Sequence, residues 1–120
     1  MIVTDHRQQL QILGKSRTPF GVKSGGHATN RGFSSTGGIQ ISLARFNTFN
    51  VNTEAKTLDL GPGLLWDDVY DQLAPYGVTV IGGRIPGVGV GGLILGGGGY
   101  DCSLHICNIH PKSFRLLVQE

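Results

Sequence analysis

The sequence predicts a mixed α+β fold, made of short strands and two helices. Residues 39–43, 49–51 and 57–60 alternate apolar and polar side chains, which is the period of a half-buried strand. Residues 64–74 instead place apolar side chains at i, i+3, i+4 and i+7 from Trp66, with three aspartates on the other face. This spacing predicts an amphipathic helix with its acidic residues near the favourable N-terminal end.

A second, shorter helix is predicted over residues 6–13. Asp5 and Gln8 form a capping-box pattern ahead of it, and Gly14 is a natural residue to follow its C-terminus. The Thr18-Pro19 dipeptide then separates this helix from the segment that follows.

The boundaries of the remaining elements are predicted from the positions of proline and glycine. Residues 20–22 are predicted as a short buried strand, residues 23–38 as a loop, and residues 78–81 as another strand before a glycine-rich loop. The aromatic side chains of Phe20, Trp66 and Tyr70 are expected in the core.

Composition excludes several classes of protein. The chain has 120 residues, enough for one domain with a modest core, and a formal net charge of +2, too small for a nucleic-acid partner to be expected. No apolar run approaches the roughly 20 residues that span a bilayer, and the first residues lack the pattern of a signal peptide. We expect neither a nucleic-acid nor a membrane partner.

Charge and glycine usage are both unusual. Charged residues make up 15% of the chain, against about 25% in typical soluble domains. A small domain this poor in charge is expected to have surface that a ligand, a partner or further polypeptide covers. Of the 20 glycines, ten lie between Gly82 and Gly99. This clustering indicates a functional loop rather than a uniform linker.

The first of two glycine-rich loops is 22–28, Val-Lys-Ser-Gly-Gly-His-Ala. Successive amides beside glycines can turn inward to bind phosphate oxygens, and Lys23 and Ser24 add a charge and a hydroxyl. An ordinary glycine turn is the alternative interpretation of this segment alone.

The second glycine-rich loop covers residues 87–99. Its first six residues match G-x-G-x-x-G, the dinucleotide fingerprint. That fingerprint must open a helix, which the run of glycines at 96–99 is expected to prevent, and no acidic residue lies between Cys102 and Gln119. The sequence therefore argues against a nicotinamide-binding Rossmann domain, and it contains no P-loop, because Gln9 stands where the first glycine would be.

In their order along the chain, these motifs resemble the FAD-binding domain of berberine bridge enzyme-like oxidoreductases, members of the vanillyl-alcohol oxidase (PCMH-type) superfamily. The resemblance covers about residues 18–100. It rests on the segments 23–27, 33–35, 38–39, 58–63, 66–70, 82–84 and 87–93. It implies two small α+β subdomains that hold FAD between them, the second one incomplete here, with a separate substrate domain to follow.

The resemblance also implies the residues that bind the cofactor. His27 matches the histidine that many members attach covalently to the flavin 8α-methyl carbon, whereas Ile85 stands where some members carry a second attachment cysteine. One covalent link at most is therefore expected. Arg84 is a candidate to neutralise the flavin or a phosphate, an exposed arginine being the alternative. The expected FAD-binding residues are Lys23, Ser24, Gly25, Gly26, His27, Ala28, Ser34, Gly83, Gly87, Val88, Gly89, Gly91 and Gly92.

The implied activity is transfer of a hydride from a substrate C–H to flavin N5, with dioxygen as the common reoxidant. The substrate is a small molecule whose identity the sequence does not give, and no residue matches the catalytic base of the family. Members are often secreted, but the sequence assigns no compartment.

From residue 101 the family pattern degrades, so residues 1–100 are predicted as a partial FAD-binding domain and 101–120 as a divergent tail. We expect a fragment that lacks the substrate domain, and a non-catalytic remnant is the alternative function. A second alternative is a small zinc module, whose cramped ligand set would be Cys102, His105, Cys107 and His110.

Overall fold

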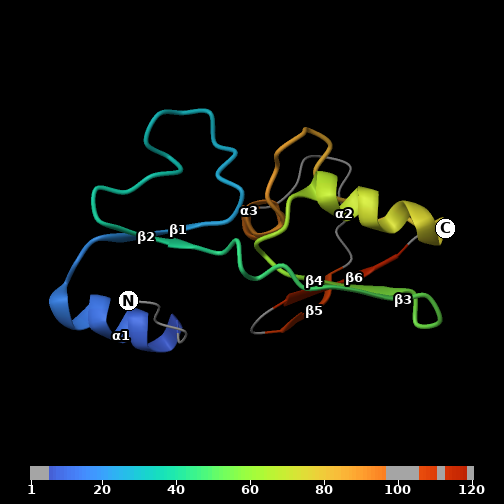
Figure 1. The fold of residues 1–120 in the computed structure, drawn as a ribbon, viewed down its shortest axis with the longest axis horizontal. Helices are drawn as coiled ribbons and strands as arrows, with labels where there is room; N and C mark the ends of the chain where they lie inside the picture. The colour runs from blue at the N-terminus through green and yellow to red at the C-terminus, as the bar shows by residue number, and fades with distance from the viewer. Residues whose placement is uncertain (1–5, 97–105, 111–112, 119–120) are drawn as a thin grey trace.

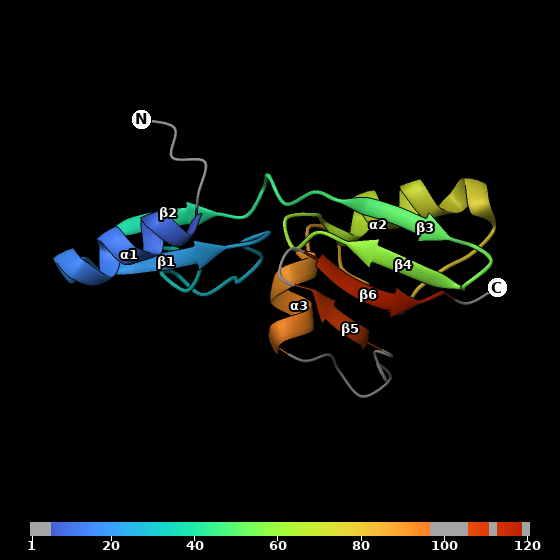
Figure 2. The same cartoon turned by 90° about the horizontal axis from the view of Figure 1, so that it is seen from below.

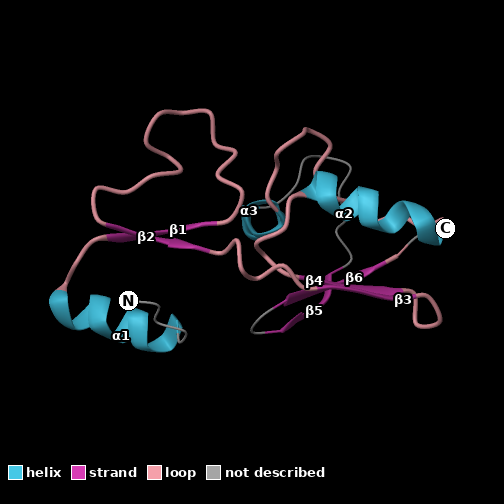
Figure 3. Ribbon diagram, in the orientation of Figure 1, coloured by secondary structure: helices cyan, strands magenta, loops and turns pink. Residues whose placement is uncertain are grey.

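The computed structural model describes residues 6–96, 106–110 and 113–118, which form two α+β parts side by side (Figures 1 and 3). The first part contains a helix and two strands. The second contains a sheet of four strands with two helices and a short 3-10 turn. The loops that leave the first part lie against the second at the middle of the molecule.

The first part begins with helix α1, His6–Ser16. It is three residues longer than predicted, because Gly14 lies within the helix and does not end it. A single glycine in a helix costs only about 1 kcal/mol. The helix ends instead at Arg17, which has a φ of 50°, and the Thr18 N–H donates to the Leu13 carbonyl at 3.2 Å.

Strands β1, Phe20–Lys23, and β2, Ile39–Ser42, form a two-stranded parallel sheet in which Phe20 pairs with Ile39. The prediction of a buried strand is wrong, as is the placement of Phe20 in the core, since Phe20 is 46% exposed and Val22 57%. Helix α1 lies across one face of this sheet (Figure 2) and its Leu13 is buried, but Phe20, Val22 and Ile39 of the sheet stay exposed.

The second sheet has the order β3-β4-β6-β5 and is antiparallel throughout. Its strands are β3 (Phe49–Asn52), β4 (Thr57–Leu60), β5 (Ile106–His110) and β6 (Ser113–Leu117). The first two agree with the predicted strands. The other two come from the segment expected to be a divergent tail, and β6 pairs directly with β4 across an Arg115–Asp59 ion pair at 2.6 Å.

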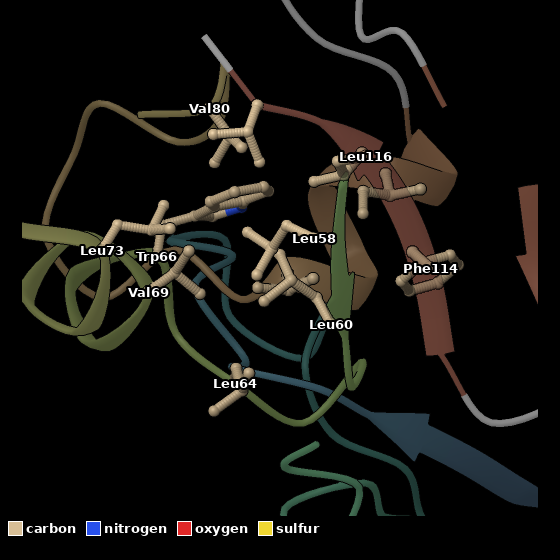
Figure 4. Packing of buried hydrophobic residues seen from close by; sticks show 12 residues of the cluster. Leu58, Leu60, Leu64, Trp66, Val69, Leu73, Val80, Phe114 and Leu116 are labelled. Carbon is tan, nitrogen blue, oxygen red and sulfur yellow. The ribbon is translucent and has the colours of Figure 1, made fainter. Parts of the chain in front are cut away.

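Helix α2, Trp66–Leu73, continues into the 3-10 turn η1, Ala74–Tyr76, and packs its apolar stripe on the sheet. The predicted helix over 64–74 is thus confirmed, apart from its ends. Trp66 is fully buried between β4 and residues 80–83, and Tyr70 is half-buried (Figure 4). The core is completed by Leu58, Leu60, Leu64, Val69, Leu73, Val80, Val90, Ile94, Phe114, Leu116 and Val118.

Two predictions around this core are wrong. Residues 78–81 form no regular strand; Val80 instead reaches down onto the indole ring of Trp66. The glycine-rich segment contains a helix, α3, Val90–Gly96, where only loop was expected. Tertiary contacts stabilise this helix, because the Val90 N–H donates to the Leu64 carbonyl at 2.9 Å and Val90 and Ile94 are buried.

None of the helices formed by the described residues is long and apolar enough to cross a bilayer.

The packing of the core predicts how far truncation of a buried side chain lowers the free energy of unfolding. Leu58→Ala removes a fully buried side chain of β4 and is expected to lower the free energy of unfolding by about 2–5 kcal/mol, measured by urea denaturation. Ile85→Ala, at a site 62% exposed, is the control and should change it by less than about 0.5 kcal/mol. Equal effects of the two changes would contradict this packing.

Candidate functional site

The two glycine-rich loops cross where Gly25 meets Gly89. A methyl group built on Gly25 would lie 2.8 Å from the backbone nitrogen and Cα of Gly89, and one built on Gly89 would overlap the backbone nitrogen of Gly25. Real side chains do not tolerate such distances, so both positions require glycine. The close approach joins the two parts of the fold backbone to backbone.

A hydrogen bond beside this crossing fixes the first loop. The Ser24 hydroxyl donates to the Pro62 carbonyl at 2.6 Å, and the Gly91 N–H donates to the same carbonyl at 3.3 Å. A methyl group on Gly91 would lie 2.9 Å from that oxygen. Ser24 and Gly91 therefore hold the loops together, and Gly91 does not line the pocket described next.

A pocket of about 240 Å³ opens at the crossing. Most of the residues predicted to bind the cofactor line it: Lys23, Ser24, Gly25, Gly26, His27, Ala28, Ser34, Val88, Gly89 and Gly92. Three apolar residues that the sequence did not single out complete the lining, namely Val22, Phe33 and Leu93. Phe33 and Leu93 occur within the segments 33–35 and 87–93 that carry the family resemblance, but an apolar side chain by itself does not indicate a ligand-binding residue.

The first loop brings unbonded backbone amides to the residues that line the pocket. Within the described residues, the N–H groups of 25–28 donate no hydrogen bond. Gly26 has a φ of 72°, and the Lys23 side chain curls beneath it, close enough that a β-carbon at Gly26 would collide with Lys23 Cε. Free amides around a lysine form a site for an anion.

His27 lies at the rim, exposed to solvent, beside Gly87 of the second loop. A methyl group on Gly87 would lie 3.6 Å from His27 Cδ2. Gly87 itself has a φ of 83°, and its N–H donates to Asp67 Oδ2 of α2 at 2.6 Å. Asp67 was not predicted, because it lies 20 residues from Gly87 and no local pattern connects the two.

The other predicted residues lie elsewhere. Gly83 does not line the pocket but packs on Trp66, where a β-carbon would lie 2.7 Å from Cδ1 of the indole. Arg84 and Ile85 are exposed and also lie outside the pocket lining. Of the zinc alternative, Cys102 and His105 fall outside the described residues, and only the backbone of Cys107 and His110 is described, in β5.

Residues 3–110 match a protein family described as an FAD-binding domain. The chain belongs to this FAD-binding domain family. FAD is therefore its cofactor, and the PCMH-type α+β fold implied by the resemblance is confirmed. The narrower likeness to berberine bridge enzyme-like members and the covalent link stay predictions.

Relatives of this FAD-binding domain include fungal flavoproteins. The FAD-dependent monooxygenase yanF of Aspergillus niger is 48% identical over 91 residues, covering 74% of this chain and 16% of that protein. An uncharacterized FAD-linked oxidoreductase of Arthroderma benhamiae is 49% identical over 88 residues, covering 72% and 18%. The chain thus spans less than a fifth of the length of these relatives.

A solved structure has the same fold. The 6-hydroxy-D-nicotine oxidase of Arthrobacter nicotinovorans superposes with a TM-score of 0.62 and 26% identity, covering 68% of this chain and 18% of that one.

The crossing predicts opposite effects for two glycines. Gly89→Ala is expected to force the loops apart and to lower the free energy of unfolding by about 1–3 kcal/mol. Gly92→Ala is the matched control, because Gly92 lies in α3 and a β-carbon there would have no neighbour within 4 Å. This change should leave the free energy of unfolding the same or raise it by about 0.5–1 kcal/mol. Urea denaturation of both variants measures this, and a tolerated Gly89→Ala would refute the close approach.

Proposed function

We propose that the chain forms the FAD-binding part of an oxidoreductase that removes a hydride from a C–H bond of a small-molecule substrate. Family membership and the monooxygenase and oxidoreductase names of the relatives support this proposal. The observation that carries it is the pocket where two glycine-rich loops cross and where the N–H groups of 25–28 donate no hydrogen bond to a described residue. When bound, FAD would accept the hydride, and dioxygen would reoxidise it.

The polar groups of the lining are suited to the diphosphate of FAD. At about 240 Å³ the pocket is smaller than the roughly 300–1,000 Å³ of sites that enclose a whole ligand, so it would hold one portion of the dinucleotide. The free amides of 25–28 and the ammonium group of Lys23 complement an anion. The missing side chains at Gly25 and Gly89 let the two loops approach each other closely enough to form this pocket.

His27 is the residue we propose for covalent attachment. A neutral imidazole nitrogen is a competent nucleophile, and the side chain is exposed at the pocket rim. His27 would form a bond to the 8α carbon in place of one C–H bond, and the two electrons of the C–H bond would pass to the flavin ring system. Dioxygen would then accept these electrons and be released as hydrogen peroxide. Ile85 cannot form a second link, because its side chain has no nucleophile.

Covalent attachment is tested on the full 120-residue chain expressed with ample FAD. The protein band of a denaturing gel is expected to fluoresce for the wild type and to be dark for His27→Ala, because only the imidazole at position 27 attaches the flavin. His6→Ala is the control, since α1 contributes nothing to the pocket, and its band should fluoresce as strongly as that of the wild type.

Binding without attachment is measured separately. Trp66 is the single tryptophan of the chain, so flavin bound at the crossing is expected to quench its fluorescence in both the wild type and His27→Ala. A dark gel band together with saturable quenching would refute covalent attachment but not the binding of FAD. A chain that neither quenches nor keeps flavin on gel filtration would refute the proposal and favour the non-catalytic remnant.

A further inference from the structure

We propose that Asp67 is a positioning residue for His27, an inference that rests on the proposed role of His27 in the FAD site. Asp67 touches neither the pocket nor the imidazole directly. It acts through Gly87, whose backbone lies between the two side chains. No local feature of the sequence connects Asp67 with the flavin site.

The first step of the argument is the hydrogen bond between Asp67 and Gly87. At 2.6 Å from the Gly87 nitrogen to Oδ2, it is short, as expected for an amide that donates to a charged oxygen. Gly87 needs such support because it lies in an irregular segment with a φ of 83°. Beside it, the Val88 N–H donates to the Ile85 carbonyl at 3.4 Å and the Val88 carbonyl accepts from the Trp66 N–H at 2.9 Å, whereas the Gly87 amide itself is bonded by Asp67.

The second step is the proximity of Gly87 to the imidazole. A methyl group built on Gly87 would be in van der Waals contact with the ring, 3.6 Å from His27 Cδ2, so the turn lies beside the imidazole. His27 is exposed, and its imidazole has no hydrogen bond to any described residue. The position of the Gly87 turn therefore limits where the ring can lie.

The third step is the rigidity of the element that carries Asp67. Asp67 follows Trp66, which is fully buried beneath Gly82 and Gly83. The first turn of α2 is thus anchored in the core, while the Asp67 carboxylate extends from it toward the loop. Because the core fixes α2, the Asp67 carboxylate and the Gly87 turn bonded to it are held in place beside His27 at the rim of the pocket.

A different role for Asp67 makes different predictions. Asp67 and Asp68 both lie in the first turn of α2, where any acidic residue favours the helix electrostatically. If that were its whole contribution, Asp68→Ala would have the same effect as Asp67→Ala, and Asp67→Asn would restore nothing. Positioning instead requires an acceptor oxygen at residue 67 alone, which the amide of Asp67→Asn still provides.

The test compares Asp67→Ala, Asp67→Asn and Asp68→Ala in the full chain without FAD, by NMR. In Asp67→Ala, exchange of the Gly87 amide with solvent is expected to be about tenfold or more faster, and the His27 Cδ2–H resonance is expected to move. Asp67→Asn should recover most of both signals, and Asp68→Ala should match the wild type. Unchanged Gly87 and His27 signals in Asp67→Ala, or equal changes in Asp68→Ala, would overturn the proposal.

Addition of FAD allows a second measurement, the fraction of covalently bound flavin. Asp67→Ala is expected to lose covalent flavin several-fold while it still quenches Trp66 at similar FAD concentrations, and Asp67→Asn should regain the covalent fraction. A wild type without covalent flavin would refute the attachment step, whereas the FAD-free spectra would still decide whether Asp67 positions His27. If Asp67→Ala does not fold, Asp67→Glu replaces it, because its longer side chain keeps the charge but displaces the acceptor oxygens.

Discussion

Gly25 and Gly89 lie so close together that neither position has room for a β-carbon, and the candidate site depends on this approach. The first part of the fold contributes the loop with Lys23 and His27, and the second contributes the segment from Val88 to Leu93. Each loop alone presents backbone to solvent. Brought together, they line one pocket that includes Lys23 and residues 25–28, whose amides donate no hydrogen bond to a described residue and could bind an anionic ligand.

The core of the second part fixes one of these loops. Trp66 is buried against Gly82 and Gly83, so the chain must pass close to the indole ring before it reaches the pocket. The start of α3 is fixed too, because the Val90 and Gly91 amides donate to carbonyls of Leu64 and Pro62. The site is therefore held by backbone hydrogen bonds and aromatic packing, and few side chains beyond Ser24 and Asp67 are needed.

The sequence predicted those features that short-range patterns encode. The helical spacing from Trp66 located α2, the alternation over 57–60 located β4, and the ordered glycine motifs identified the family. Features that depend on distant residues were missed. Helix α3 forms despite its glycines because other segments accept its first amides, and Phe20 is exposed even though α1 lies beside its sheet. Most of the expected cofactor residues do line one pocket, but their role in binding stays a prediction.

The strand order of the larger sheet has a consequence for how this chain folds during synthesis. Strand β6 lies between β4 and β5, and its partner on β4 is some 56 residues earlier in the chain, as for Arg115 and Asp59. Trp66 and α2 emerge from the ribosome well before β6, so the sheet on which they pack is incomplete until residues 113–117 have been made. Closing so long a loop is entropically costly and slow. The apolar stripe of α2 thus stays partly uncovered while residues 74–117 are synthesised, and during that interval it is available to chaperones.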